Sequence, residues 1–158
     1  MPSQPRWLAS MLRVIDVAVR DVKTVEEDEP VVKAADLMCQ HNIGCLVVTK
    51  DGKPVGMLTE RDILKKVVVP CLDPRATRVS KVMSRPLITG DPDMDVVYAA
   101  KFMVSRDIKR LPIVDGGRLV GIVTFTDLMR AMPGLVKALE ESLALERLHP
   151  RFRKLLRK

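Results

Sequence analysis

The sequence predicts an α/β protein of the α+β kind, built from two β-α-β-β-α repeats with short flanking helices. The chain has 158 residues, 47% of them hydrophobic, which suffices for one domain or two small ones. Residues 14–67 align without a gap on residues 79–132 at an offset of 65, with 17 identities in 54 pairs. Each repeat also carries apolar residues at helical spacing, followed by a hairpin signal. A tandem duplication follows from these observations.

An amphipathic helix is expected early in each repeat, after a short strand. In the first repeat, the apolar residues Val31, Ala34 and Met38 lie three, four or seven positions apart, which predicts a helix over 30–41. The same spacing predicts a helix over 93–105 in the second repeat.

A β-hairpin and a second helix are expected after each first helix. The predicted hairpin strands are 45–49 and 55–58 in the first repeat, and 111–114 and 119–124 in the second. Asp51-Gly52 and Gly116-Gly117 lie between the paired strands, and both are typical two-residue hairpin turns. The second helices are expected to begin near Thr59 and Thr124.

These elements define five predicted segments. They are a flanking helix at 1–13, the first repeat at 14–67, a linker at 68–78, the second repeat at 79–132 and a basic helical tail at 133–158. The linker contains two prolines, which predicts an extended crossover. One repeat cannot bury both faces of a small sheet, so we expect the two to pack about a pseudo-two-fold axis.

The two ends of the chain carry most of its net charge of +7. Residues 1–13 contribute +2 and residues 133–158 contribute +4. The tail either improves solubility or binds a nucleic acid or a partner protein. Both ends also carry apolar stripes, from Trp7 to Leu12 and from Leu135 to Leu143. A second copy of the chain could cover them, which predicts a homodimer.

Several classes of protein are excluded by what the sequence lacks. No apolar run reaches about 18 residues, so no membrane span is expected. The three cysteines show no C-x-x-C spacing, which argues against disulfides and zinc and favours the cytoplasm. The sequence has no nucleophile–base pair, metal cluster or phosphate-binding loop, so we expect neither an enzyme nor an obligatory cofactor.

One motif with chemical potential occurs in both repeats. The pattern G-h-h-T-x-x-D, where h is apolar, spans 56–62 and 121–127. Each Thr stands where a strand should end and a helix begin, so unpaired amides of the first turn could bind an anion. Each Asp could accept hydrogen bonds from the vicinal hydroxyls of a ribose. The alternative is a plain capping box that only stabilises the helix start.

With these motifs in place, the chain resembles a tandem pair of cystathionine β-synthase (CBS) domains over about residues 14–132. The resemblance rests on the two motifs, the hairpin before each, the strand Lys109–Val114 with its turn, and the entry segment Val79–Ser84. It implies a regulatory module that binds AMP, ADP, ATP or S-adenosylmethionine in two clefts between the repeats. It also implies frequent dimerisation, and any regulated target is expected to be a separate protein.

The resemblance further implies the residues of the two clefts. The first would use Met57, Thr59, Arg61 and Asp62 with Lys109, Arg110, Leu111 and Pro112; the second would use Ile122, Thr124, Thr126 and Asp127 with Ile43, Gly44 and Cys45. Asp would hold ribose, Thr and nearby bases the phosphates, and aliphatic side chains and strand backbone the adenine. Lys109 and Arg110 could instead be strand-edge charges that discourage aggregation.

Overall fold

The computed structural model describes residues 12–134 and 137, which form two compact units. The first-repeat unit comprises Asp21–Ile88 with Gly116–Leu119, and the second-repeat unit the described residues of Met1–Arg20, Thr89–Asp115 and Val120–Lys158. The predicted flanking helix and tail lie almost entirely outside the described residues. The mixed α+β fold class predicted from the sequence is confirmed.

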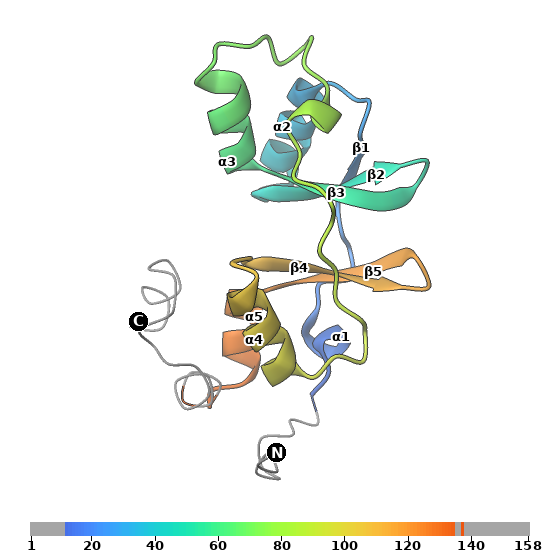
Figure 1. The fold of residues 1–158 in the computed structure, drawn as a ribbon, viewed down its shortest axis with the longest axis vertical. Coiled ribbons are helices and arrows are strands. Elements are labelled where there is room, and N and C mark those ends of the chain that lie inside the picture. Colours follow the sequence, from blue (N-terminus) through green and yellow to red (C-terminus); the bar gives the residue numbers. More distant parts are fainter. Residues whose placement is uncertain (1–11, 135–136, 138–158) are drawn as a thin grey trace. The chain divides into compact units, whose positions relative to one another are not determined.

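The first-repeat unit is a three-stranded sheet with helices on one face (Figure 1). Its elements are β1 (Thr24–Glu26), α2 (Val31–His41), β2 (Cys45–Lys50), β3 (Lys53–Thr59), α3 (Glu60–Ile63) and a π-helical turn (Leu64–Val68). The strand order is β1-β2-β3, with β1 parallel and β3 antiparallel to β2. The predicted helix and hairpin are therefore confirmed within one or two residues at most ends.

An aliphatic core joins this sheet to its helices. Val31, Ala34 and Met38, the residues that predicted α2, are buried against the sheet residues Leu46 and Leu58. Burying one such side chain contributes about 1.5–3 kcal/mol. The core also includes Val79, Val82 and Met83, which come from the entry of the second repeat.

Both hairpin turns have the predicted geometry. Asp51 and Gly52 have φ values of 51° and 77°, and Gly116 and Gly117 have 54° and 81°. Two successive positive φ values define the turn that matches the twist of the flanking strands.

The second-repeat unit lacks the first strand of the predicted pattern. Its elements are α1 (Val14–Val17), α4 (Val96–Ser105), β4 (Arg110–Asp115), β5 (Arg118–Thr124) and α5 (Phe125–Ala131). Strands β4 and β5 form a two-stranded sheet. At the position equivalent to β1, the second repeat forms only an isolated parallel bridge, which joins Gly90 to Ile113.

Two residue differences between the repeats explain why the second repeat lacks this strand. In the first-repeat unit, the amide of Val47 donates to the carbonyl of Lys23 at 3.3 Å. The equivalent residue in β4 is Pro112, which has no N–H to donate. Gly90 replaces Val25, and a Cβ added there would lie 2.8 Å from Leu111 Cδ2. The expectation of a full first strand in the second repeat was therefore wrong.

The linker at 68–78 is folded into turns, which corrects the prediction of an extended crossover. The amide of Leu72 donates to the carbonyl of Val67 at 2.9 Å, and those of Ala76 and Thr77 donate to Asp73. The carbonyls of Pro74 and Thr77 then accept from the first amides of α2, at 3.0 and 2.8 Å. The linker backbone thus caps α2, whose N-cap residue is a proline without a capping side chain.

Each unit contains the entry segment of the other repeat. In the first-repeat unit, Ser84 and Met57 exchange two backbone hydrogen bonds of 2.8 and 3.0 Å. In the second-repeat unit, Val19 and Ile122 exchange two of 2.9 Å. These pairs are equivalent at the offset of 65, so the exchange follows the internal repeat.

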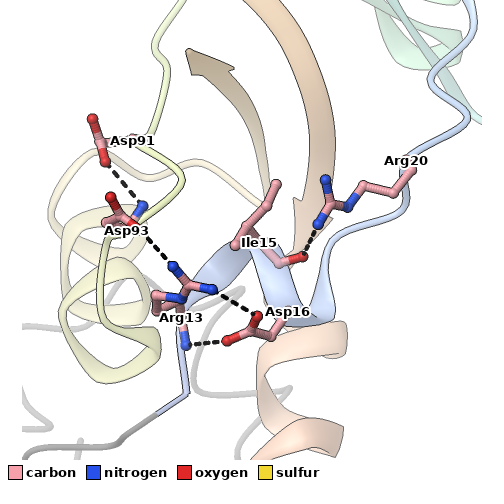
Figure 2. A network of polar contacts seen from close by, with 6 residues as sticks. All are labelled: Arg13, Ile15, Asp16, Arg20, Asp91 and Asp93. Carbon is pink, nitrogen blue, oxygen red and sulfur yellow. Dashed lines mark hydrogen bonds and ion pairs between the residues drawn. The ribbon is translucent and has the colours of Figure 1, made fainter.

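Arg13 fastens the first entry segment to the second-repeat unit (Figure 2). Its guanidinium donates to Asp93 at 2.8 Å, and its amide donates to Asp16 at 3.0 Å. Asp93 is held in turn by a bond from its amide to Asp91 at 2.9 Å. Arg20 donates to the carbonyl of Ile15 at 3.2 Å and closes the same segment.

Candidate ligand-binding site

Both T-x-x-D motifs form capping boxes at the start of a helix. The amide of Asp62 donates to Thr59 Oγ1 at 3.2 Å, and Asp62 Oδ2 accepts from the amide of Thr59 at 3.0 Å. In the second repeat, the matching distances between Thr124 and Asp127 are 3.0 and 2.9 Å. Both motifs therefore form the capping box that the sequence offered as the alternative. The backbone amide of each Thr, however, donates to only one oxygen, Oδ2, of the Asp carboxylate.

The other oxygen, Oδ1, differs between the two aspartates. Asp62 Oδ1 lies 3.1 Å from Lys66 Nζ, four residues along the chain. Among the described residues, Asp127 Oδ1 has no hydrogen bond or ion pair. The position equivalent to Lys66 is Ala131, which carries no charge.

The first amide of each helix is bonded to the start of the preceding hairpin. The amide of Glu60 donates to the carbonyl of Gly44 at 3.1 Å, and that of Phe125 donates to the carbonyl of Lys109 at 2.9 Å. The third amide of each helix, that of the motif Asp, is taken by the Thr hydroxyl. The expectation that the first-turn amides are unpaired was therefore wrong for these positions.

The glycine of each motif gives room to an entry segment. A Cβ added to Gly56 would lie 2.9 Å from both Met83 Sδ and the carbonyl oxygen of Ser84. A Cβ on Gly121 would lie 3.0 Å from Ala18 Cβ. The glycine thus permits the close approach of two backbones beside the motif.

The predicted site residues fall into two groups, one in each unit. The first-repeat unit holds Ile43, Gly44, Cys45, Met57, Thr59, Arg61 and Asp62; the second-repeat unit holds Lys109, Arg110, Leu111, Pro112, Ile122, Thr124, Thr126 and Asp127. Each group combines a T-x-x-D motif with the start of its own hairpin. The division of these residues into two clefts, each drawing on both repeats, stays a prediction.

Exposure separates the residues that can offer a side chain to a ligand from those that cannot. Arg61 and Thr126 are exposed, and Lys109 and Arg110 are half-buried. Leu111 is fully buried and Pro112 is buried as well. These last two can therefore offer a ligand their backbone more readily than their side chains.

Two residues that lie near the first motif were not predicted from the sequence. Lys66 contacts Asp62 and also donates to the carbonyl of Val82 at 2.7 Å. Glu60 places its carboxylate beside Gly44, since a Cβ added there would lie 3.2 Å from Glu60 Cδ. The spacing of Asp62 and Lys66 is the usual one for a helical ion pair and could have indicated the first contact.

Every helix within residues 12–134 and 137 is too short or too polar to span a lipid bilayer.

Comparison with known proteins identifies relatives over most of the chain. A CBS-domain family model matches residues 14–69 and again 79–134. An uncharacterised protein of Methanopyrus kandleri is 42% identical over 130 residues, 81% of this chain and 66% of that protein. The CBS domain-containing protein YhcV of Bacillus subtilis is 42% identical over 118 residues, 75% of this chain and 84% of that protein.

A solved structure extends the likeness to three dimensions. The hexameric CBS-CP12 protein from bloom-forming cyanobacteria has a TM-score of 0.72 and is 28% identical. The match covers 80% of this chain and 71% of that protein. The duplicated motif, the repeated hairpins and these relatives agree, and the chain belongs to the CBS-domain family, with two CBS domains in tandem.

Proposed function

We propose that this chain is a non-catalytic regulatory module that binds an adenosine nucleotide and conveys its presence to a separate partner protein. CBS-domain pairs are typically regulatory and often bind nucleotides. The observation that carries the proposal is the motif Asp held in a fixed orientation by its capping box, with Oδ1 of Asp127 left for a ligand.

The carboxylate of Asp127 has the chemistry that a ribose requires. A carboxylate has about four acceptor positions on its two oxygens, so it can take both hydrogen bonds of a vicinal diol. Because the cap fixes the rotamer of Asp127, little side-chain entropy is lost when a diol binds. Within the second-repeat unit, Thr126, Lys109 and Arg110 are proposed to bind the phosphates, and the backbone of β4 the adenine. Lys109 and Arg110 are thereby assigned to the site of Asp127, whereas the family resemblance alone would assign them to the cleft of Asp62.

AMP, ADP, ATP and S-adenosylmethionine are the proposed regulatory ligands, and none is proposed as an obligatory cofactor. A cytoplasmic location stays a prediction from the cysteine pattern. A homodimer is also proposed, because Leu64 and Val68 in the π-helical turn and Leu72 shortly after it are exposed apolar side chains.

A thermal-shift screen tests the binding proposal. Any of the four ligands that binds should raise the unfolding temperature, because a ligand at 100 times its Kd adds about 2.7 kcal/mol to the free energy of unfolding. The Asp62→Ala, Asp127→Ala double variant should show no shift. No shift of the parent chain with any of the four would contradict the proposal.

A further inference from the structure

The two motif aspartates differ in how many acceptor positions they have left. Asp62 Oδ2 accepts from both the amide and the hydroxyl of Thr59, at 3.0 and 2.9 Å. Asp62 Oδ1 forms an ion pair with Lys66 Nζ at 3.1 Å, so the ammonium covers this oxygen. Of about four acceptor positions on the carboxylate, one is left, and a vicinal diol needs two.

Asp127 has the room that Asp62 lacks. Among the described residues, only the amide of Thr124 donates to it, at 2.9 Å on Oδ2. About three acceptor positions therefore stay open, including both on Oδ1. A diol can bind Asp127 without displacing any group that the structure describes.

Lys66 is fastened at a second point as well. Its ammonium donates to the carbonyl of Val82 at 2.7 Å, in the entry segment of the second repeat. Asp62 itself is only 16% exposed at its side chain. A diol that approached Asp62 would have to break the ion pair and disturb the bond to Val82.

The charged residues near each motif also favour a ligand at Asp127 over one at Asp62. Beside Asp62, the carboxylate of Glu60 lies against Gly44, where a ligand phosphate would be repelled. At the equivalent positions, the second-repeat unit has buried Phe125 and the base Lys109. The carboxylate of Asp62 is thus paired with its own lysine, whereas among the described residues Asp127 keeps an open oxygen, in a helix whose first amide donates to the carbonyl of Lys109.

We propose that the two repeats have divided the role of the motif, an inference that rests on the proposed nucleotide binding. Asp127 recognises the ribose diol. Lys66 excludes a diol from Asp62, and the first motif instead holds the segment Val79–Ser84 in place. The chain therefore has one diol-binding site, and Lys66 determines which repeat carries it.

Calorimetric titration with AMP tests this division in five full-length variants, each first shown to be folded by circular dichroism. The parent chain should bind one AMP per chain. Asp127→Ala should abolish binding, and Asp62→Ala should change the Kd by less than about threefold. Lys66→Met should open a second site and raise the stoichiometry to two.

The reciprocal substitution, at position 131, tests the role of the lysine most directly. Ala131→Lys places a lysine four residues after Asp127, as Lys66 stands after Asp62, and should weaken AMP binding about tenfold or more. Ala131→Met adds similar bulk without charge and should bind AMP like the parent chain.

Distinct outcomes separate this inference from the function on which it rests. Two AMP sites in the parent chain would overturn the division and leave nucleotide binding intact. The same holds for equal losses in the two Asp variants, for a Lys66→Met variant with no second site, or for equal effects of Lys and Met at 131. No binding to any of the chains would overturn both proposals.

Discussion

Asp62 and Asp127 stand at the same position of the internal repeat, yet a single residue four positions along makes them chemically different. Each uses Oδ2 to complete a helix cap. Lys66 then occupies Asp62 Oδ1, whereas Ala131 leaves that oxygen of Asp127 open. A motif can therefore keep its structural role in both copies while its role in binding is confined to one.

The structural role predicts a loss of stability when the capping hydroxyl is removed. Thr59→Ala and Thr124→Ala should each lower the free energy of unfolding by about 0.5–2 kcal/mol, because a helix amide loses its acceptor. Urea unfolding measures the change. Thr→Ser at the same positions keeps the hydroxyl and should retain most of the stability, and equal losses for Ser and Ala would argue against a capping role.

Glu26 makes the stability of the first-repeat unit depend on pH. Its carboxylate accepts from Thr49 at 2.6 Å and from the amides of Asp51 and Gly52 in the hairpin turn. The hydrogen bond from Thr49, followed by those from the two amides, lowers the pKa of Glu26 below its ordinary value of about 4.5. A carboxyl whose pKa is lower in the folded state stabilises the fold above the unfolded pKa.

Stability from this carboxylate should therefore be lost as the pH falls below about 4.5. Urea midpoints measured between about pH 3 and pH 7 should fall less steeply on the acid side for Glu26→Gln than for the parent chain. Asp28→Asn, which changes an exposed acid, serves as the control. If the urea midpoints of Glu26→Gln and the parent chain fall equally at acid pH, the hydrogen bonds from the hairpin turn to residue 26 do not depend on the charge of its side chain.

At the scale of elements, the G-h-h-T-x-x-D pattern describes three contacts rather than one. The glycine admits an entry segment, the apolar pair continues the strand, and the Thr and Asp close the helix cap. Because Met57 pairs with Ser84 and Ile122 with Val19, each strand that leads to a motif is also paired with chain from the other repeat.

Gly56→Ala and Gly121→Ala should both destabilise the protein, by about 1–3 kcal/mol, since overpacking forces the neighbouring backbone to move. The loss should be larger at Gly56, where a Cβ would meet the backbone oxygen of Ser84 at 2.9 Å. Thermal or urea unfolding measures it. Gly134→Ala, with no atom within 4 Å of the added Cβ, should be neutral. Unchanged stability at Gly56 would mean that the entry segment does not pack there.

Local chemistry made the helices and hairpins predictable, because their signals lie within a few residues. Helical spacing predicted α2, and Asp51-Gly52 predicted a hairpin turn. The capping box was foreseen as an alternative for the same reason. Contacts between distant segments were not predictable. The bond from Lys66 to Val82 and the pairing of Val19 with Ile122 depend on where the fold brings segments together.

Two further expectations were wrong, one because the repeats were treated as identical and the other because the linker was judged by its prolines. Pro112 and Gly90 remove the first strand of the second repeat through one lost amide and one lost side chain. The linker was predicted from its prolines alone, but its carbonyls also serve the uncapped helix α2. The roles of the site residues remain predictions, since the structure places these residues in two groups, one in each unit.

For the whole molecule, self-association is the property that the exposed surface suggests. Leu64, Val68 and Leu72 are 56%, 57% and 47% exposed, and burying one such side chain at an interface is worth about 1.5–3 kcal/mol at most. Light scattering should give the mass of a dimer or a larger assembly. Val68→Glu should shift it toward the monomer, because a charge would be buried without a partner. A monomeric parent chain at tens of micromolar would contradict the homodimer.

Recognition of a ribose diol by a capped aspartate is the central claim for the whole molecule, and calorimetry with AMP and 2′,3′-dideoxy-AMP tests it most directly. The two ligands differ only in the hydroxyls that Asp127 is proposed to bind. AMP should bind, and the dideoxy analogue should bind at least about tenfold more weakly, because two hydrogen bonds to a charged acceptor are lost. Equal affinities for the two ligands would contradict the account.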